Sequence, residues 1–144
     1  DEEVRLRDSV EVTLEAGSTC AAQTGILHDP YSGKIVPFDR AVQPLAVEVE
    51  HIVSLHDIYY SGGWQMSYEQ RVAIAHDLER ELVLTSRTEN QAKKEKTPAE
   101  WMPSDPASWC WYAATYIDVK ATYHLTVDQE NRAFLRDVIT ACQG

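Results

Sequence analysis

Two short groups of polar residues have the types and spacing to take a proton from water, bind a metal ion and contact a phosphate. Glu50 and His51 stand together at the end of an alternating segment, and Asn90 precedes Lys93 by three positions. Histidine titrates near neutral pH and can take a proton from water, while carboxylate and amide oxygens are ligands for Mg²⁺. A lysine three positions after an asparagine lies on the same helix face and can contact a phosphate. Each pair alone also fits a capped strand end or a solvated helix face.

Other chemical motifs in the chain are better explained by structure. His56-Asp57 and His76-Asp77 resemble metal-binding pairs, but neither has a third ligand at a helical or strand spacing, so we expect surface or capping roles. The tryptophans could stack on bases, yet burial is the commoner use of aromatic side chains, and we assign them to the core. The sequence contains no Gly-rich phosphate loop, Gly-x-Ser-x-Gly elbow or His-Glu-x-x-His helix.

The first element that must position these residues is a strand. From residue 45 the chain alternates apolar and polar side chains through Glu50, and the alternation breaks at His51-Ile52-Val53. Ideal alternation places Glu48 and Glu50 on one face of the strand and His51 on the other. Glu50 and His51 can therefore converge on one ion only if the strand twists or ends there.

A second strand and a polar helix follow along the chain. Residues 82–85 are apolar and β-favouring, which predicts a short buried strand. Ser86 can cap a helix that carries Asn90 and Lys93 and stops at Thr97-Pro98, because the residue before a proline avoids the helical region. The remaining patterns predict a short strand within residues 1–16, an ordered loop over 24–40, a helix over about 68–80 and two antiparallel helices over about 105–142.

The composition fits one soluble α+β domain over residues 1–144, with a strand–strand–helix unit at about 45–96 and a helical tail at about 105–142. No run approaches the roughly 20 apolar residues of a bilayer span, so no membrane association is expected. The formal net charge of −10 opposes nucleic-acid binding, since lysine and arginine contacts supply most of that affinity. A local basic cluster offsets this charge and comprises Arg87, Lys93, Lys94 and Lys96.

The three cysteines predict one disulfide and one odd thiol. Cys110 and Cys142 stand at the start and end of the predicted helical hairpin, where antiparallel helices bring them together. Cys20 has no such partner. A disulfide indicates an oxidising compartment, so we expect a secreted or extracytoplasmic protein.

The order of the motifs resembles that of HNH nucleases of the ββα-metal superfamily, in which acid-His ends a strand, a short apolar strand follows and Asn-x-x-Lys lies in a helix. The likeness is closest to their secreted bacterial branch, which is related to the C-terminal domain of GmrSD restriction endonucleases. It runs from about Cys20 to Cys142. The resembling segments are Asp29-Pro30-Tyr31-Ser32-Gly33, residues 47–55, residues 90–96, residues 98–103 and residues 120–125.

This resemblance implies an α+β endonuclease that hydrolyses phosphodiester bonds in nucleic acid, DNA in preference to RNA, and that is secreted and bacterial. It gives His51 the general-base position and makes Glu50 and Asn90 ligands of one divalent cation, Mg²⁺ or Mn²⁺. The expected substrate-binding residues are Arg87, Lys93, Lys94 and Lys96. The sequence identifies no protein inhibitor.

Departures from the family pattern leave a second hypothesis open. Glu50 stands where the family usually has an aspartate, and Glu81 stands where many members have an asparagine that steadies the histidine's loop. His76 replaces an asparagine, and an upstream cysteine of the secreted branch is missing. The alternative is a catalytically silent module of the HNH fold that binds a protein partner or divalent cations through its acidic surface. A cleavage assay with and without metal discriminates between the two.

Overall fold

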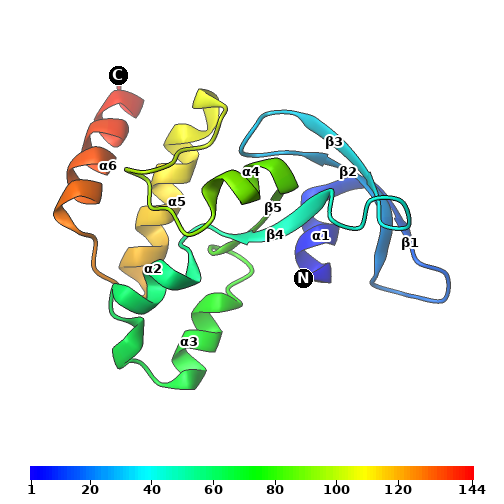
Figure 1. Cartoon of the computed structure of the whole chain (residues 1–144), viewed down its shortest axis with the longest axis horizontal. Helices are drawn as coiled ribbons and strands as arrows, with labels where there is room; N and C mark the ends of the chain where they lie inside the picture. Colours follow the sequence, from blue (N-terminus) through cyan, green and yellow to red (C-terminus); the bar gives the residue numbers. More distant parts are fainter.

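The chain forms a three-stranded sheet, a central two-stranded sheet and a group of helices (Figure 1). The computed structural model describes residues 1–144. In chain order the elements are α1 (Glu2–Asp8), β1 (Ser9–Leu14), β2 (Ala22–His28), β3 (Ile35–Asp39), β4 (Val47–His51), α2 (Leu55–Tyr60), η1 (Gly63–Gln65), α3 (Tyr68–Ala75), β5 (Leu82–Ser86), α4 (Arg87–Lys93), η2 (Pro106–Ser108), α5 (Trp109–Thr122) and α6 (Gln129–Cys142). The expected α+β class is confirmed.

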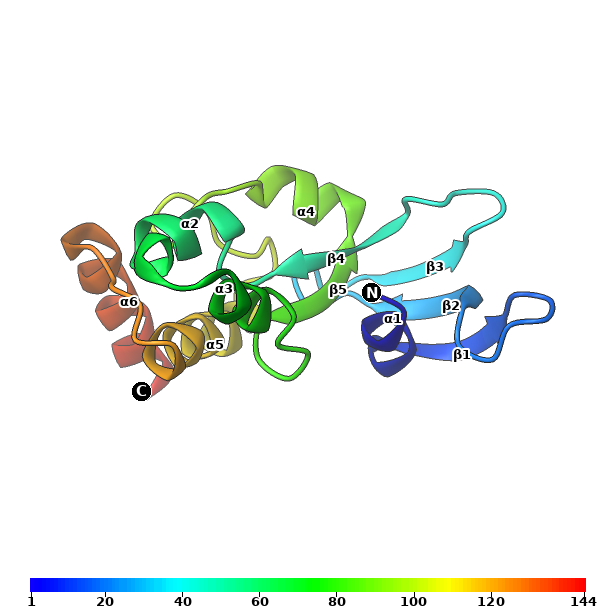
Figure 2. The same ribbon diagram turned by 90° about the horizontal axis from the view of Figure 1, so that it is seen from below.

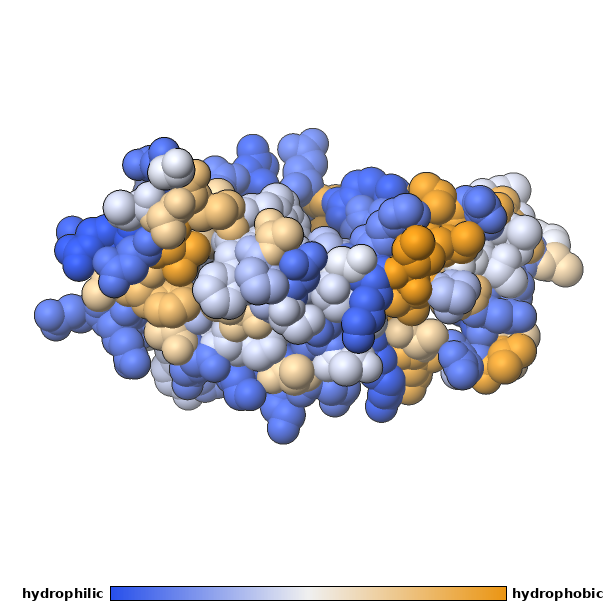
Figure 3. Space-filling model, turned by 90° about the horizontal axis from the view of Figure 1, so that it is seen from above, coloured by the Kyte–Doolittle hydropathy of each residue, from blue (hydrophilic) through white to orange (hydrophobic).

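The molecule is elongated, and its two-stranded sheet lies between two unlike ends. Figures 1 and 2 show strands β1 to β3 at one end, α5 and α6 at the other, and β4, β5 and α4 between them. Seen from above, the largest continuous hydrophobic area lies toward the end that holds the three-stranded sheet (Figure 3). No helix has the length and apolar character needed to cross a membrane.

The three-stranded sheet is antiparallel, with β2 between β1 and β3. The expectation of a loop over residues 24–40 was therefore wrong, although the turn at Asp29–Gly33 is present and joins β2 to β3. Two residues that usually weaken strands obscured the pattern. Gly25 lies so close to the Phe38 ring that an added Cβ would come within 2.7 Å of it. Pro37 is tolerated because β3 is an edge strand.

The expected strand within residues 1–16 is present as β1, which covers the alternating residues Val10, Val12 and Leu14, and the residues before it form α1. Glu2 and Glu3 lie in the first turn, where a helix favours acidic side chains. Glu2 also accepts a hydrogen bond from the Arg5 guanidinium at 2.8 Å. Val4, which is 1% exposed, fixes the helix against the core.

The central two-stranded sheet pairs β4 with β5 in antiparallel register, from Val47 opposite Ser86 to His51 opposite Leu82. The Ser86 hydroxyl then caps α4 by accepting a hydrogen bond from the backbone of Glu89 at 3.4 Å. The helix ends at Lys93, before the expected stop at Thr97, because Lys94 has a positive φ of 53°. Strands β4 and β5 are separated in the chain by α2, η1 and α3, whereas α4 follows β5 directly, and all three elements are adjacent in space.

Helix α3 begins as its sequence indicated and ends early. Ser67 and Gln70 form a reciprocal capping box at its start. The helix stops at Ala75 instead of about residue 80, because the Asp77 carboxylate accepts hydrogen bonds from the backbone of the next residues and forms a turn. This turn leads directly into β5.

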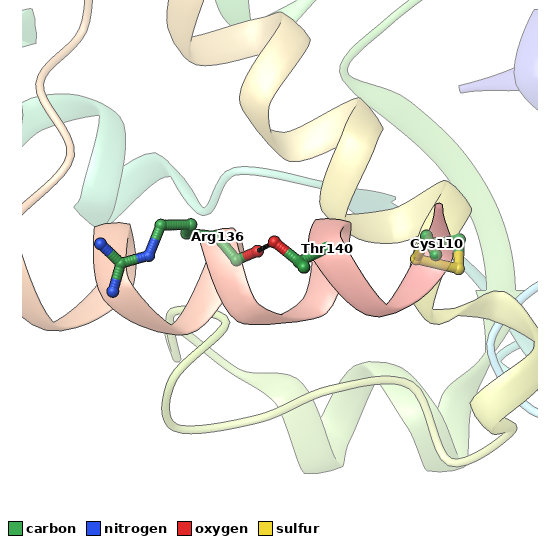
Figure 4. The surroundings of a disulfide bond; sticks show 4 residues. Cys110, Arg136 and Thr140 are labelled. Carbon is green, nitrogen blue, oxygen red and sulfur yellow. Dashed lines mark hydrogen bonds between the residues drawn. A yellow bond between two sulfur atoms is a disulfide. The ribbon is translucent and has the colours of Figure 1, made fainter. Parts of the chain in front are cut away.

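The helical tail contains the expected disulfide. Cys110 on α5 and Cys142 on α6 are bonded, with their Cα atoms 5.7 Å apart, while Cys20 is an exposed free thiol. Figure 4 shows the bond beside the last turns of α6, where the Thr140 hydroxyl donates to the Arg136 carbonyl at 2.7 Å. The bond joins the N-terminal end of α5 to the C-terminal end of α6.

Candidate active site

Two sets of polar contacts connect β4 to α4. Glu48 and Glu50 are two positions apart on a strand, so their side chains share one face. Asn90 and Lys93 are three positions apart on a helix and also share one face. Glu48 contacts Asn90, and Glu50 contacts Lys93.

The inner set is a buried ion pair. The Lys93 ammonium lies 2.5 Å from a carboxylate oxygen of Glu50 and also donates to the His51 carbonyl at 2.9 Å. The hydroxyl of Tyr31, from the turn between β2 and β3, donates to the other oxygen of Glu50. The side chains of Lys93 and Glu50 are only 0% and 4% exposed. Burial raises the pKa of Glu50, an effect that Lys93 and Tyr31 partly oppose.

The outer set lies at the surface. The Asn90 amide donates to Glu48 at 2.6 Å, and the Arg87 guanidinium donates to the other oxygen of the same carboxylate at 2.9 Å. A weaker contact comes from Gln91 at 3.4 Å. Because Asn90 uses its NH₂ group in this contact, its amide oxygen remains able to accept a hydrogen bond or to coordinate a metal ion.

The two sets differ in how well they fit a divalent ion. Both oxygens of Glu50 are engaged, and an ion bound there would stand beside the Lys93 ammonium, which repels it. Both oxygens of Glu48 are engaged as well, but its partners Arg87 and Gln91 are exposed side chains that can move away, whereas Lys93 is buried. Glu48 and the Asn90 oxygen thus offer a carboxylate and an amide near the surface. This set suits Mg²⁺, which keeps several waters and often binds through only one or two protein ligands. No group of three or more His, Cys, Asp or Glu residues in the chain could hold a metal ion.

The side chain of His51 points toward α3. Its Nε2 lies 3.1 Å from the Ala75 carbonyl, which can only accept, so Nε2 carries the proton and Nδ1 has a free lone pair. Burial lowers the pKa of His51, and the nearby charges of Lys93 and His76 lower it further against the effect of the carbonyl. The ring is therefore neutral at neutral pH and can accept a proton.

Glu81 supports the backbone that follows His51. Its carboxylate accepts from the Val53 N–H with both oxygens at 3.2 Å, and its own carbonyl accepts from the Ile52 N–H at 2.9 Å. Burial, together with the charges of Glu50 and Asp77, raises the pKa of Glu81 to about 9. At neutral pH this residue is consequently an uncharged acid, which is sterically and electrically close to an amide.

The expected basic cluster is divided by the fold. Lys94 and Lys96 are exposed and line a hollow of about 580 Å³ together with His56. Arg87 is exposed but paired with Glu48. Lys93 is completely buried, so in this arrangement it faces Glu50 and not a substrate. Lys94 and Lys96 are therefore the members whose charges are free to meet a phosphate.

Comparison with known proteins identifies the family of this chain. Residues 3–138 match the GmrSD restriction endonucleases, C-terminal domain. The chain belongs to this family. A relative of this GmrSD C-terminal domain, described as an uncharacterized secreted protein from Arthroderma benhamiae, is 30% identical over 142 residues. The match covers 98% of this chain and 66% of the relative, just under two thirds of its length. No solved structure matches the chain significantly.

Two residues of this GmrSD C-terminal domain were not among the sequence candidates for the site. Glu48 carries the surface carboxylate beside Asn90. The sequence feature that could have identified Glu48 is the strand alternation, which places it on the same face as Glu50. Tyr31 reaches Glu50 from a distant turn, and the sequence offered only the Asp29–Gly33 segment shared with the family, without a role for its tyrosine.

Proposed function

We propose that this domain hydrolyses phosphodiester bonds of nucleic acids, with His51 as the general base. The observation that carries the proposal is the hydrogen bond between His51 Nε2 and the Ala75 carbonyl. It leaves Nδ1 as the proton acceptor and sets the plane of the ring. Membership of a nuclease-related family supports the same reaction class.

In this mechanism Nδ1 of His51 takes a proton from the attacking water. The Ala75 carbonyl then stabilises the imidazolium that forms, because the Nε2–H donor becomes more positive. The buried Lys93 holds the His51 carbonyl and so fixes the end of β4. Lys94 and Lys96 attract the phosphate backbone despite the net charge of −10.

One divalent cation, Mg²⁺ or Mn²⁺, is part of the proposal. Glu48 and Asn90 would hold it, since their side chains are in contact near the surface, whereas Glu50 is buried and engaged by Lys93 and Tyr31. When bound, such an ion neutralises charge that develops on the phosphate and on the leaving oxygen. DNA is the proposed substrate in preference to RNA. A secreted location is supported by the disulfide and by the description of the relative.

The test is cleavage of plasmid DNA and of RNA with Mg²⁺, Mn²⁺ or EDTA. His51→Ala should stay folded by circular dichroism, still bind Mn²⁺ and lose about 10²- to 10⁴-fold in rate. His28→Ala is the matched control, because His28 is exposed at the end of β2 and its ring makes no hydrogen bond. Cleavage by His51→Ala within a few-fold of the parent rules out this base.

A catalytically silent module remains a second candidate, favoured by one observation. Glu50, the acid that precedes the histidine, is neutralised by Lys93 and covered from solvent. A silent domain would bind a protein partner or divalent cations through its acidic surface. Such a domain would leave DNA and RNA intact under every metal condition in the cleavage assay. Circular dichroism would show that it is nevertheless folded.

A further inference from the structure

Helix α2 exposes three ring side chains that the hydrophobic core does not use. The ring centroids of His56 and Tyr60 are 4.6 Å apart, and those of Tyr59 and Tyr60 are 5.3 Å apart at a steep angle. Tyr59 is 46% exposed and Tyr60 is 70% exposed. We refer to His56, Tyr59 and Tyr60 as the α2 aromatic surface. Their mutual contacts hold the rings in place while most of Tyr60 remains open to solvent.

This surface adjoins the basic end of α4. His56 lines the hollow of about 580 Å³ that also contains Lys94 and Lys96. The Ser54 hydroxyl, which caps α2, donates to the Glu95 carbonyl at 3.2 Å and so ties the two segments together. The views in Figures 1 and 2 agree that α2 lies beside the segment that leaves α4.

The hollow contains charges of both signs, and its two lysines are free to meet an anion. Lys94 and Lys96 are both exposed, and Lys96 makes only one contact, to the Ala92 carbonyl at 3.0 Å. Two acids also line the hollow. One of them, Glu100, uses a carboxylate oxygen to accept from the backbone and hydroxyl of Thr97 at 2.8 and 3.0 Å. These hydrogen bonds lower the pKa of Glu100, so its carboxylate stays charged and is held against Thr97.

We propose that the α2 aromatic surface stacks unpaired bases of the substrate while Lys94 and Lys96 hold its backbone, so that the domain acts on single-stranded nucleic acid. The proposal rests on the nuclease function proposed above. Lysines next to exposed aromatic rings are the combination with which proteins bind single strands. A base inside a duplex is already stacked on both faces and cannot use the Tyr60 ring.

The net charge of the protein makes stacking important. With a formal charge of −10, binding through phosphates alone is weak, because that affinity depends on released counterions. Stacking does not depend on net charge and is tolerant of base identity. Stacking on the α2 aromatic surface would therefore add affinity for nucleic acid that the net negative charge of the protein does not reduce.

The test is fluorescence anisotropy with a labelled single-stranded oligothymidine and with a duplex of equal length, in EDTA, with probe integrity checked on a gel. Tyr60→Ala should weaken single-strand binding by about 5- to 100-fold, which is the range for loss of one stacked base. Tyr60→Phe keeps the ring and should bind within about twofold of the parent. Tyr68→Ala is the matched control, since Tyr68 is 71% exposed on α3 and belongs to no aromatic pair.

Two results would overturn the proposal. One is that Tyr60→Ala leaves single-strand binding unchanged, and the other is that the parent binds the duplex as tightly as the single strand. If the parent cleaves nucleic acid and Tyr60→Ala binds and cleaves single strands equally well, the nuclease function stands and base stacking fails. If no nucleic acid is cleaved but Tyr60→Ala selectively loses single-strand binding, stacking stands and the nuclease function fails.

Discussion

Replacing Glu81 by glutamine should change how the stability of the protein depends on pH. Glu81 is completely buried, and burial with the charges of Glu50 and Asp77 raises its pKa from 4.5 to about 9. In the unfolded chain the same carboxyl titrates near 4.5. Between these two values the folded protein holds one more proton than the unfolded chain at this position.

The sign follows from this extra proton. Where the folded state binds more protons, the free energy of unfolding falls as pH rises, here by about 1.4 kcal/mol per pH unit. The stabilising contribution is complete below pH 4.5 and is lost progressively until the pH reaches about 9. Between pH 5.5 and pH 7.5 the Glu81 carboxyl alone should lower the free energy of unfolding by about 2.7 kcal/mol. Glutamine carries no titrating proton and can still accept from the Val53 N–H, so the variant should lack this loss.

Urea unfolding, followed by tryptophan fluorescence at several pH values, measures the effect. The stability of Glu81→Gln relative to the parent should increase by about 2–3 kcal/mol between pH 5.5 and 7.5, whatever constant packing difference the new side chain introduces. Glu79→Gln is the control, because the Glu79 side chain is 85% exposed. A difference between Glu81→Gln and the parent that stays constant with pH would refute the reasoning.

Three further predictions follow from the site and the tail. Replacing Cys110 and Cys142 by serine should lower the free energy of unfolding by about 3–4 kcal/mol, because the bond spans 32 positions; an unchanged urea midpoint without reductant contradicts this. Asn90→Ala and Glu48→Gln should each weaken Mn²⁺ binding by about tenfold or more in calorimetry, and a variant with unchanged affinity removes its residue from the metal shell. The cleavage rate should fall with decreasing pH through an apparent pKa below 6.5, since only neutral His51 accepts a proton; a pH–rate profile with an acid limb above 6.5 excludes this assignment.

The sequence predicted the elements around the site because their local signals agree with the tertiary structure. Residues 47–50 alternate apolar and polar side chains and residues 82–85 are apolar and β-favouring, and the two segments form β4 and β5. Ser86 and Ser67 cap helices because their hydroxyls satisfy free backbone N–H groups. The disulfide was predictable because its cysteines lie at opposite ends of two antiparallel helices.

The contacts within the site could not be predicted in the same way. Lys93 has the sequence signal of a phosphate-binding lysine, but the tertiary structure buries it against Glu50. Tyr31 comes from a turn 19 positions before Glu50, and no periodic pattern connects the two. Strand alternation indicated that Glu48 and Glu50 share a face, but not which of the two is reached by Lys93 and which stays at the surface.

Tyr31 limits how this domain can be shortened or transplanted. Its ring is completely buried, with its centroid 5.3 Å from that of Trp101 and 5.5 Å from that of Tyr112, and its hydroxyl reaches Glu50. A graft that carried residues 45–96 alone onto another scaffold would lack Tyr31 and both of the rings that pack on it, and would remove a donor from the buried Glu50 carboxylate. The smallest portable form of the site must therefore include the β2–β3 hairpin, although that hairpin holds none of the residues proposed to do the chemistry.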